Sequence, residues 1–123
     1  MYELKIVTQF AAAHRLRDFQ GKCEQLHGHN WKVEVYIQAD QLDSAGLVRD
    51  FGEIKAMTKE VLQGLDHHYL NELVPFQTEN PSSEHIARYL FQQLSDRLND
   101  GRAKVSKISV WESDTSCATY LGK

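Results

Sequence analysis

The sequence is poor in the features that mark secreted, membrane-bound and nucleic-acid-binding proteins. It has only two cysteines, Cys23 and Cys117, too few for the disulfide framework that staples small secreted domains, so we expect two reduced thiols. Its uninterrupted nonpolar runs are a few residues long, whereas a membrane-spanning helix needs about 20. No apolar segment follows the first residues, so no signal peptide is expected, and the expected location is cytoplasmic.

Positive charge is also scarce. The 14 Lys and Arg residues are outnumbered by 17 Asp and Glu, which gives a net charge of −3. A domain whose main task is nucleic-acid binding usually carries a basic excess or a basic stripe. Neither is visible, so we expect no nucleic-acid partner and no membrane partner. The length of 123 residues indicates a single domain over residues 1–123, large enough to bury a core.

Two segments near the N-terminus alternate between apolar and polar residues. Residues 2–14 and residues 27–39 each place their apolar side chains on one parity, which predicts two strands with one buried face. His14 continues the apolar parity of the first strand, and His27 and His29 extend that of the second. The apolar positions are Tyr2, Leu4, Ile6, Phe10 and Ala12, and Trp31, Val33, Val35, Ile37 and Ala39.

The middle of the sequence has helical spacing. Asp50 followed by Glu53 resembles a capping box, and the apolar spacing after it predicts a helix that ends near Gly64. Ser82 or Ser83 can cap a second helix, which ends at Asp100-Gly101. Its buried stripe comprises Ile86, Leu90, Leu94 and Leu98.

The end of the sequence returns to strands, over residues 104–112 and 116–121. The order ββααββ predicts an α+β fold, with a four-stranded antiparallel sheet and two helices on one face. The segment 66–81 is expected to be irregular. A small open sheet has two exposed edges, and pairing them between subunits is one way to cover them, so we expect a homo-oligomer.

Three histidines predict a metal site. His27 and His29 point to the same face of a strand, and His14 comes from the buried face of the preceding strand. Three imidazoles suit Zn²⁺ and leave a fourth position open for water or substrate, as in catalytic zinc sites. Cys23, four residues before His27, is either the fourth ligand of a closed structural site or a nucleophile or base beside the metal.

Two further groups are candidates for proton transfer and binding. Asp66 beside His67 is typical of an oriented imidazole, and with Cys23 it makes a plausible relay; the alternative is a histidine pair at a helix terminus. Glu112 shares the apolar parity of its strand, so it is either a carboxylate that accepts N–H groups from a guanidine-like ring edge or an exposed strand-end residue. Cys117 is expected to be a small core residue.

Taken together, these residues resemble the 6-pyruvoyl-tetrahydropterin synthase family. The spacing of Cys23 from His-Gly-His is similar to the queuosine-pathway branch of the family, which makes 6-carboxy-5,6,7,8-tetrahydropterin. The segments that carry the resemblance are Cys23 to His29, Asp50-Phe51, Leu65 to Asn71, Asn80 to Glu84 and Trp111-Glu112.

The resemblance implies a tunnelling fold, in which subunits join their sheets into a barrel, commonly as hexamers with active sites between subunits. It implies that His14, His27 and His29 hold zinc, and that Cys23 is the general base with His67 and Asp66 as its relay. Glu112 would anchor the pterin ring. The substrate would be 7,8-dihydroneopterin triphosphate, and the products 6-carboxy-5,6,7,8-tetrahydropterin, acetaldehyde and triphosphate.

Other functions remain open. Within the family, the product could be the 6-pyruvoyl compound, or the side chain of dihydroneopterin could be cleaved. A zinc hydrolase with a His-x-His-x-Asp-His motif is disfavoured, because Trp31 and Lys32 occupy the last two positions. A zinc-stabilised binding domain with Cys23 as a ligand is a non-enzymatic alternative. Candidates for the triphosphate are Arg15, Arg17 and Lys22.

Overall fold

The computed structural model describes residues 1–18 and 24–123. Cys23 and Lys22 therefore lie outside the described residues. The elements follow the order β1 (Tyr2–His14), β2 (His27–Ala39), α1 (Phe51–Gln63), β3 (His68–Tyr69), η1 (Leu70–Glu72), η2 (Val74–Phe76), α2 (Ser83–Leu98), β4 (Lys104–Ser113) and β5 (Ser116–Tyr120). No helix among them is long and apolar enough to cross a membrane.

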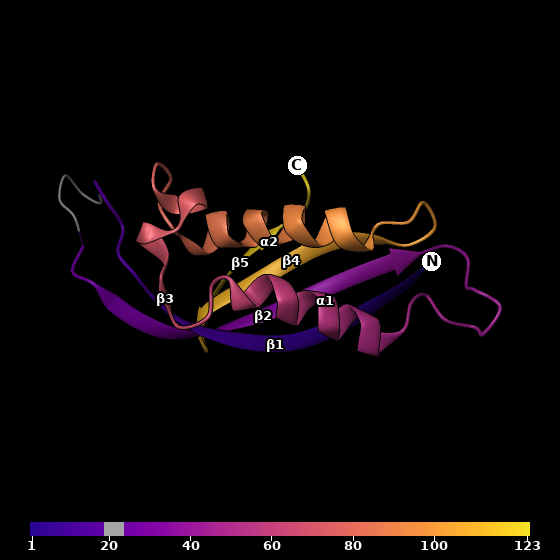
Figure 1. Ribbon diagram of the computed structural model, residues 1–123. Coiled ribbons are helices and arrows are strands. Elements are labelled where there is room, and N and C mark those ends of the chain that lie inside the picture. The colour runs from indigo at the N-terminus through magenta and orange to yellow at the C-terminus, as the bar shows by residue number, and fades with distance from the viewer. Residues whose placement is uncertain (19–23) are drawn as a thin grey trace.

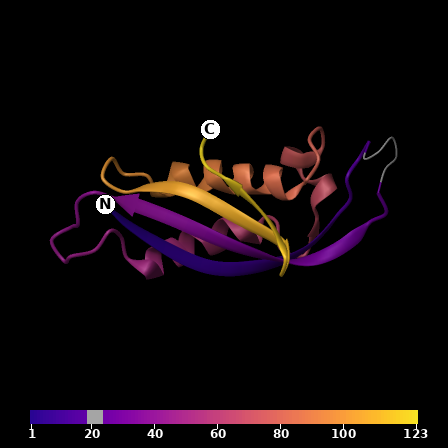
Figure 2. The same cartoon turned by 180° about the vertical axis from the view of Figure 1, so that it is seen from behind.

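The α+β prediction is confirmed, with one correction to the sheet. Among the described residues five strands form one mixed sheet, in the order β3-β1-β2-β4-β5, and both helices cover the same face (Figures 1 and 2). The predicted four strands pair antiparallel, and the short β3 adds to the edge by pairing in parallel with Ala12 and Ala13. Two residues carry no periodicity, so the segment 66–81 gave no strand signal.

The core lies between the sheet and the two helices. In β2 every second residue from Trp31 to Ala39 is buried, and Trp31 is fully buried. The helices contribute Ile54, Val61 and the predicted α2 stripe to the same core. Burial of this apolar face is the main favourable term in the folding of such a layer.

The helix starts follow the predicted capping residues in part. Asp50 caps α1 by accepting from the Gly52 N–H, but the predicted capping box is wrong, because Glu53 pairs with the Arg49 guanidinium at 2.7 Å. Ser82 caps α2 by accepting from the His85 N–H.

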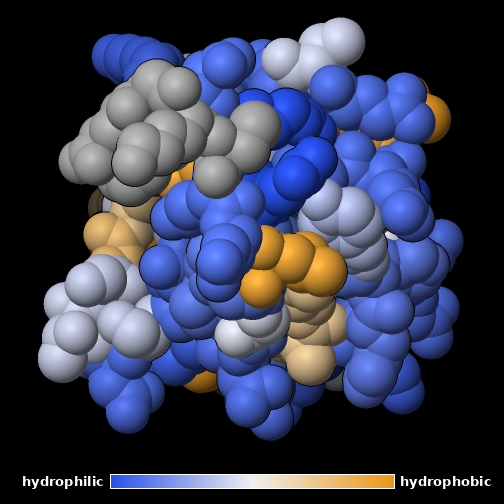
Figure 3. All heavy atoms as spheres, turned by 90° about the vertical axis from the view of Figure 1, so that its left-hand side faces the viewer, coloured by the Kyte–Doolittle hydropathy of each residue, from blue (hydrophilic) through white to orange (hydrophobic). Residues whose placement is uncertain are grey.

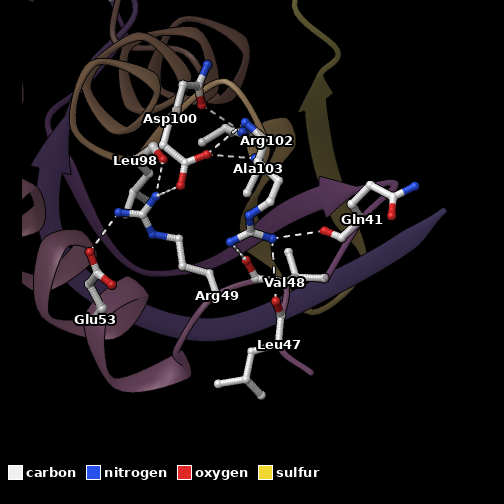
Figure 4. A network of polar contacts seen from close by, with 11 residues as sticks. Gln41, Leu47, Val48, Arg49, Glu53, Leu98, Asp100, Arg102 and Ala103 are labelled. Carbon is white, nitrogen blue, oxygen red and sulfur yellow. Dashed lines mark hydrogen bonds and ion pairs between the residues drawn. The ribbon is translucent and has the colours of Figure 1, made fainter. Parts of the chain in front are cut away.

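Two arginines hold the end of the sheet where β2 finishes (Figure 4). Arg49 also donates to the Leu98 carbonyl and to Asp100, and Arg102 donates to the carbonyls of Gln41, Leu47 and Val48. These bonds join the β2–α1 connection to the end of α2. They lie at the opposite end of β2 from His27 (Figure 1).

The helix-free face of the sheet carries one feature that polar alternation did not predict. Glu34 is buried there, between the Lys5 ammonium at 3.3 Å and the Trp111 indole N–H. Burial raises the pKa of Glu34, but the hydrogen bonds from Trp111 and Lys5 outweigh it, so the pKa lies below its ordinary value. Cys117, predicted as a core residue, is exposed on the edge strand β5.

Trp31 should be the most costly single residue to truncate. We expect Trp31→Ala to lower the free energy of unfolding by about 3–5 kcal/mol, because it leaves a large cavity and removes the indole N–H bond to the Ala12 carbonyl. Denaturant unfolding measures the loss. Val7→Ala, at an exposed position of β1, is the control and should change stability by about 0.5 kcal/mol or less. Equal losses in the two variants would contradict the placement of Trp31 in the core.

Candidate metal centre

The register of β1 and β2 brings the three predicted ligands together. His14 is the last residue of β1 and lies directly opposite His27, the first residue of β2, while His29 lies opposite Ala12. The three ring centroids are 4.6 to 5.2 Å apart, and their candidate ligand atoms all lie within 4.8 Å of one another. This is the one cluster of its kind found among residues 1–18 and 24–123. Three His side chains could therefore hold a metal ion here.

Hydrogen bonds to carbonyl oxygens orient two of the rings. His14 Nδ1 lies 2.8 Å from the Pro81 carbonyl, and His27 Nδ1 lies 2.9 Å from the Gln25 carbonyl. A carbonyl oxygen can only accept, so in each case Nδ1 carries the proton and Nε2 keeps its lone pair. Metal-ligating histidines use the same arrangement, in which the second ring nitrogen donates to a carbonyl or carboxylate.

The unpartnered nitrogens support a metal at this position. Nε2 of His14 and Nε2 of His29 are both buried and have no hydrogen-bond partner. Buried polar atoms are nearly always paired, so two orphan nitrogens in one cluster require an explanation, and a metal ion supplies it. Burial lowers the pKa of His14, and this keeps its imidazole neutral, as a ligand must be. The Trp31 ring packs against the rings of His14 and His29, with centroids 4.8 and 5.2 Å away.

Glu112 reaches the same cluster from β4. Its carboxylate oxygens lie 3.7 Å from His14 Nε2 and 3.8 Å from His29 Nε2, and 39% of the side chain is exposed. Glu112 is the second-last residue of β4, so it is a partly exposed strand-end residue that also lies beside the cluster. Glu112 lies at the rim of a hollow of about 200 Å³, which is lined by Ser83, Glu84, Glu112, Ser116, Cys117 and Ala118.

Glu84 is the residue that the sequence analysis passed over. It stands in the first turn of α2 and lines the same hollow as Glu112, so two acidic residues line this space. Its signal was present in the sequence, since the segment Asn80 to Glu84 carries the family resemblance. Glu84 lies in α2 and Glu112 in β4, so only the tertiary fold shows that the two residues line one hollow.

Asp66 and His67 form the predicted pair, but at the edge of the sheet. His67 Nδ1 lies 3.0 Å from the Asp66 carboxylate, whose other oxygen accepts the Ala11 N–H at 2.8 Å. The Ala11 hydrogen bond is the main reason that the pKa of Asp66 lies below its ordinary value. The His67 side chain is 81% exposed. Among the described residues, no hydrogen bond or ion pair joins this pair to the three-histidine cluster or to Glu112.

The segment that follows Cys23 and two of the three triphosphate candidates lie within the described residues. Glu24, which follows Cys23, donates its N–H to the Leu16 carbonyl, and its carboxylate accepts the Leu16 N–H at 3.1 Å. Arg17 is ill suited to bind a triphosphate, because its guanidinium already donates to the carbonyls of Asn71, Phe76 and Glu79. Arg15 is exposed. Figure 3 shows this end of the molecule, where hydrophilic residues cover most of the surface.

Each of the three histidines should be needed for metal binding. We expect His14→Ala, His27→Ala and His29→Ala each to abolish tight binding of Zn²⁺, because two imidazoles are left where three are needed. Equilibrium dialysis with metal analysis measures the stoichiometry. His68→Ala is the control, because His68 is exposed and lies outside the cluster, and it should retain one Zn²⁺ per chain. Retention of Zn²⁺ by His14→Ala would contradict the assignment.

The metal-free protein should lose stability on acidification partly through His14. Its pKa is lowered in the folded state, so below about pH 6.5 the unfolded chain binds a proton at this residue that the folded chain does not. The free energy of unfolding should therefore fall as the pH decreases from about 7.5 to about 5.5, and less steeply in His14→Gln. Urea unfolding at a series of pH values measures this, and an equal slope in both proteins would contradict it.

The sequence and the fold both match one family. The family described as "6-pyruvoyl tetrahydropterin synthase" matches residues 3–123. A protein from Synechocystis sp. described as 6-carboxy-5,6,7,8-tetrahydropterin synthase is 37% identical over 117 residues, which cover 91% of this chain and 87% of that protein. A Pyrococcus furiosus protein described as dihydroneopterin monophosphate aldolase is 31% identical over 107 residues, which cover 87% of this chain and 86% of that protein.

A solved structure shares the fold over almost its whole length. The structure of Caenorhabditis elegans 6-pyruvoyl tetrahydropterin synthase superposes with a TM-score of 0.86 at 25% identity, and the match covers 99% of this chain and 96% of that one. The subunit fold expected from the family resemblance is thereby confirmed. The chain belongs to the 6-pyruvoyl tetrahydropterin synthase family.

Proposed function

We propose that the protein is a zinc-dependent lyase of the queuosine pathway. It converts 7,8-dihydroneopterin triphosphate and water to 6-carboxy-5,6,7,8-tetrahydropterin, acetaldehyde and triphosphate. The observation that carries the proposal is the cluster of His14, His27 and His29, with two buried Nε2 atoms that lack partners. The similarity to the Synechocystis protein supports the choice of reaction.

The proposed chemistry divides between the metal site and groups that move protons. Zinc bound by the three imidazoles would leave one position open to the hydroxyls of the substrate side chain and would polarise them. Cys23 is proposed as the general base that removes a proton from that side chain. Asp66 holds the His67 imidazole in one orientation, so that His67 can exchange protons with the base. General base catalysis of this kind contributes about 10²–10⁴-fold.

Two carboxylates are available for the pterin, and their positions suggest different tasks. The side chain of the substrate is attached at one end of the bicyclic ring, and the aminopyrimidinone edge lies at the opposite end. Glu112 lies against the metal ligands, so it suits proton transfer at the substrate side chain. Glu84 lines the same hollow and is the second candidate for the ring-anchoring role that the family resemblance assigns to Glu112.

The position of the Asp66–His67 pair favours an active site shared between subunits. The pair is hydrogen-bonded to β1 at the sheet edge, and no hydrogen bond or ion pair in the described part of the chain joins it to the three histidines, although His67 and His29 line one open hollow. In the same part of the chain no strand pairs with the outer edge of β5, or with the edge of β1 that faces away from β2 between Tyr2 and Ala11. We propose that these edges join in a homo-oligomeric barrel, in a hexamer, and that His67 serves the site of an adjacent subunit.

A product assay tests the reaction. Zinc-loaded protein is incubated with 7,8-dihydroneopterin triphosphate, the pterins are identified by mass, and acetaldehyde is measured. A 6-carboxypterin together with acetaldehyde is the expected result. A 6-pyruvoyl product would replace the proposed reaction with the other synthase activity. Glycolaldehyde triphosphate with 6-hydroxymethyl-7,8-dihydropterin would indicate aldolase activity, for which the similarity to the Pyrococcus protein is the specific support.

Substitution of Cys23 distinguishes the proposed enzyme from a zinc-stabilised binding domain. We expect Cys23→Ala to keep the fold and one Zn²⁺ per chain but to lower turnover by about 10²–10⁴-fold, because a base is lost and no ligand. Metal analysis, circular dichroism and the product assay measure the three properties. Ser44→Ala, at an exposed position of the β2–α1 connection, is the control and should retain turnover. Loss of Zn²⁺ and of the fold in Cys23→Ala would favour the binding domain.

Substitutions of Glu112 and Glu84 should change different steady-state kinetic parameters. If Glu112 acts at the substrate side chain and Glu84 holds the ring, Glu112→Gln lowers kcat, whereas Glu84→Gln chiefly raises KM. Both variants keep the size of the side chain and remove its charge. A rise in KM without loss of kcat in Glu112→Gln would instead return the ring-anchoring role to Glu112.

A further inference from the structure

The chain that leaves β1 is held by two asparagine side chains. The Asn71 amide accepts the Arg15 N–H at 2.9 Å and donates to the Arg15 carbonyl at 2.9 Å. The Asn80 amide accepts the Arg17 N–H at 2.8 Å and donates to the Arg17 carbonyl at 2.9 Å. Each side chain thus makes the pair of hydrogen bonds that a residue of a neighbouring strand would make.

These amides take the place of backbone pairing between two segments. Among the described residues, every hydrogen bond that joins residues 15–18 to residues 70–81 uses a side chain, and none joins backbone to backbone. Besides the bonds of the two amides, the hydrogen bonds between these segments come from the Arg17 guanidinium, at the end of a long side chain. The two amides are shorter and make paired bonds, so they fix the distance between the segments.

The same two segments carry both ends of the bond that orients a metal ligand. His14 directly precedes Arg15, and its Nδ1 lies 2.8 Å from the carbonyl of Pro81, the residue after Asn80. The Asn80 carbonyl is in turn 2.6 Å from His85 Nδ1 in the first turn of α2. The His14 ring is therefore oriented by a carbonyl that directly follows Asn80, in a segment that the Asn71 and Asn80 amide pairs hold against residues 15–17.

We propose that Asn71 and Asn80 are positioning residues of the metal centre. They hold Pro81 against His14, so that Nδ1 keeps its proton and Nε2 points at the metal. The inference rests on the three-histidine metal centre proposed above but not on the identity of the substrate. Loss of such outer contacts typically lowers metal affinity about 10–100-fold.

Asparagine-to-aspartate variants test the proposal at constant side-chain size. In Asn71→Asp and Asn80→Asp an ionised carboxylate faces the carbonyl that the amide donated to, so that bond is lost. Asn99→Asp is the matched control. The Asn99 side chain only accepts a hydrogen bond, from the Val105 N–H at 2.9 Å, and a carboxylate can accept the same bond. Arg102→Gln is the control for general destabilisation, because it removes donors to three carbonyls at the other end of the sheet (Figure 4).

Co²⁺ titration, the visible absorption spectrum of the bound Co²⁺ and the melting temperature are measured on all four variants. We expect Co²⁺ affinity to fall about 10–100-fold in Asn71→Asp and Asn80→Asp, with a changed absorption spectrum. Asn99→Asp should bind like the unmodified protein. Arg102→Gln should melt at a lower temperature and still bind Co²⁺ with full affinity and an unchanged spectrum.

Two outcomes would overturn the proposal. Wild-type Co²⁺ affinity and spectrum in folded Asn80→Asp would make the asparagines structural only, and so would an equal loss of affinity in Arg102→Gln. If Asn71→Asp does not fold, because Asn71 is buried, the partly exposed Asn80 carries the test through Asn80→Asp and Asn80→Ser. Failure of the proposed function alone would look different: the unmodified protein would bind Co²⁺, His14→Ala would not, and neither would turn over the pterin.

Discussion

The antiparallel register of β1 and β2 is the constraint on which the rest of the structure depends. It sets His14 opposite His27 and, two residues further along, His29 opposite Ala12 on the same face. Because side chains alternate along a strand, a slip of one residue would turn His14 to the helix-free face and separate the three imidazoles. The register is specified by burial, since the same slip would also expose the apolar face that includes Phe10 and Trp31.

The candidate site is assembled from elements that are far apart in the sequence. The sheet supplies the three imidazoles and Glu112, whereas the connection between α1 and α2 supplies the carbonyl that orients His14 and the amides that hold the chain after it. The cap of α2 at Ser82 anchors this connection next to Glu84. The candidate metal centre and the hollow beside it thus share one support, the start of α2, although their side chains come from different elements.

Much of this arrangement follows from local physics and could be predicted from the sequence. Period-2 alternation gave β1 and β2 and placed all three histidines on the buried face, and capping residues gave the start of both helices. The features that could not be predicted depend on tertiary contacts. The strand β3 has two residues, Glu34 is buried because Trp111 and Lys5 reach it, and the bonds of Asn71 and Asn80 span more than 50 residues.

X-ray absorption at the zinc edge of the Zn²⁺-loaded protein tests the central claim most directly, because it distinguishes an open three-histidine site from a closed structural one. We expect a first shell of nitrogen and oxygen only, at about 2.0–2.1 Å, with the multiple-scattering signature of three imidazoles. A sulfur ligand at about 2.3 Å would show that Cys23 or Cys117 completes the coordination sphere, and this would contradict a catalytic metal centre with an open position.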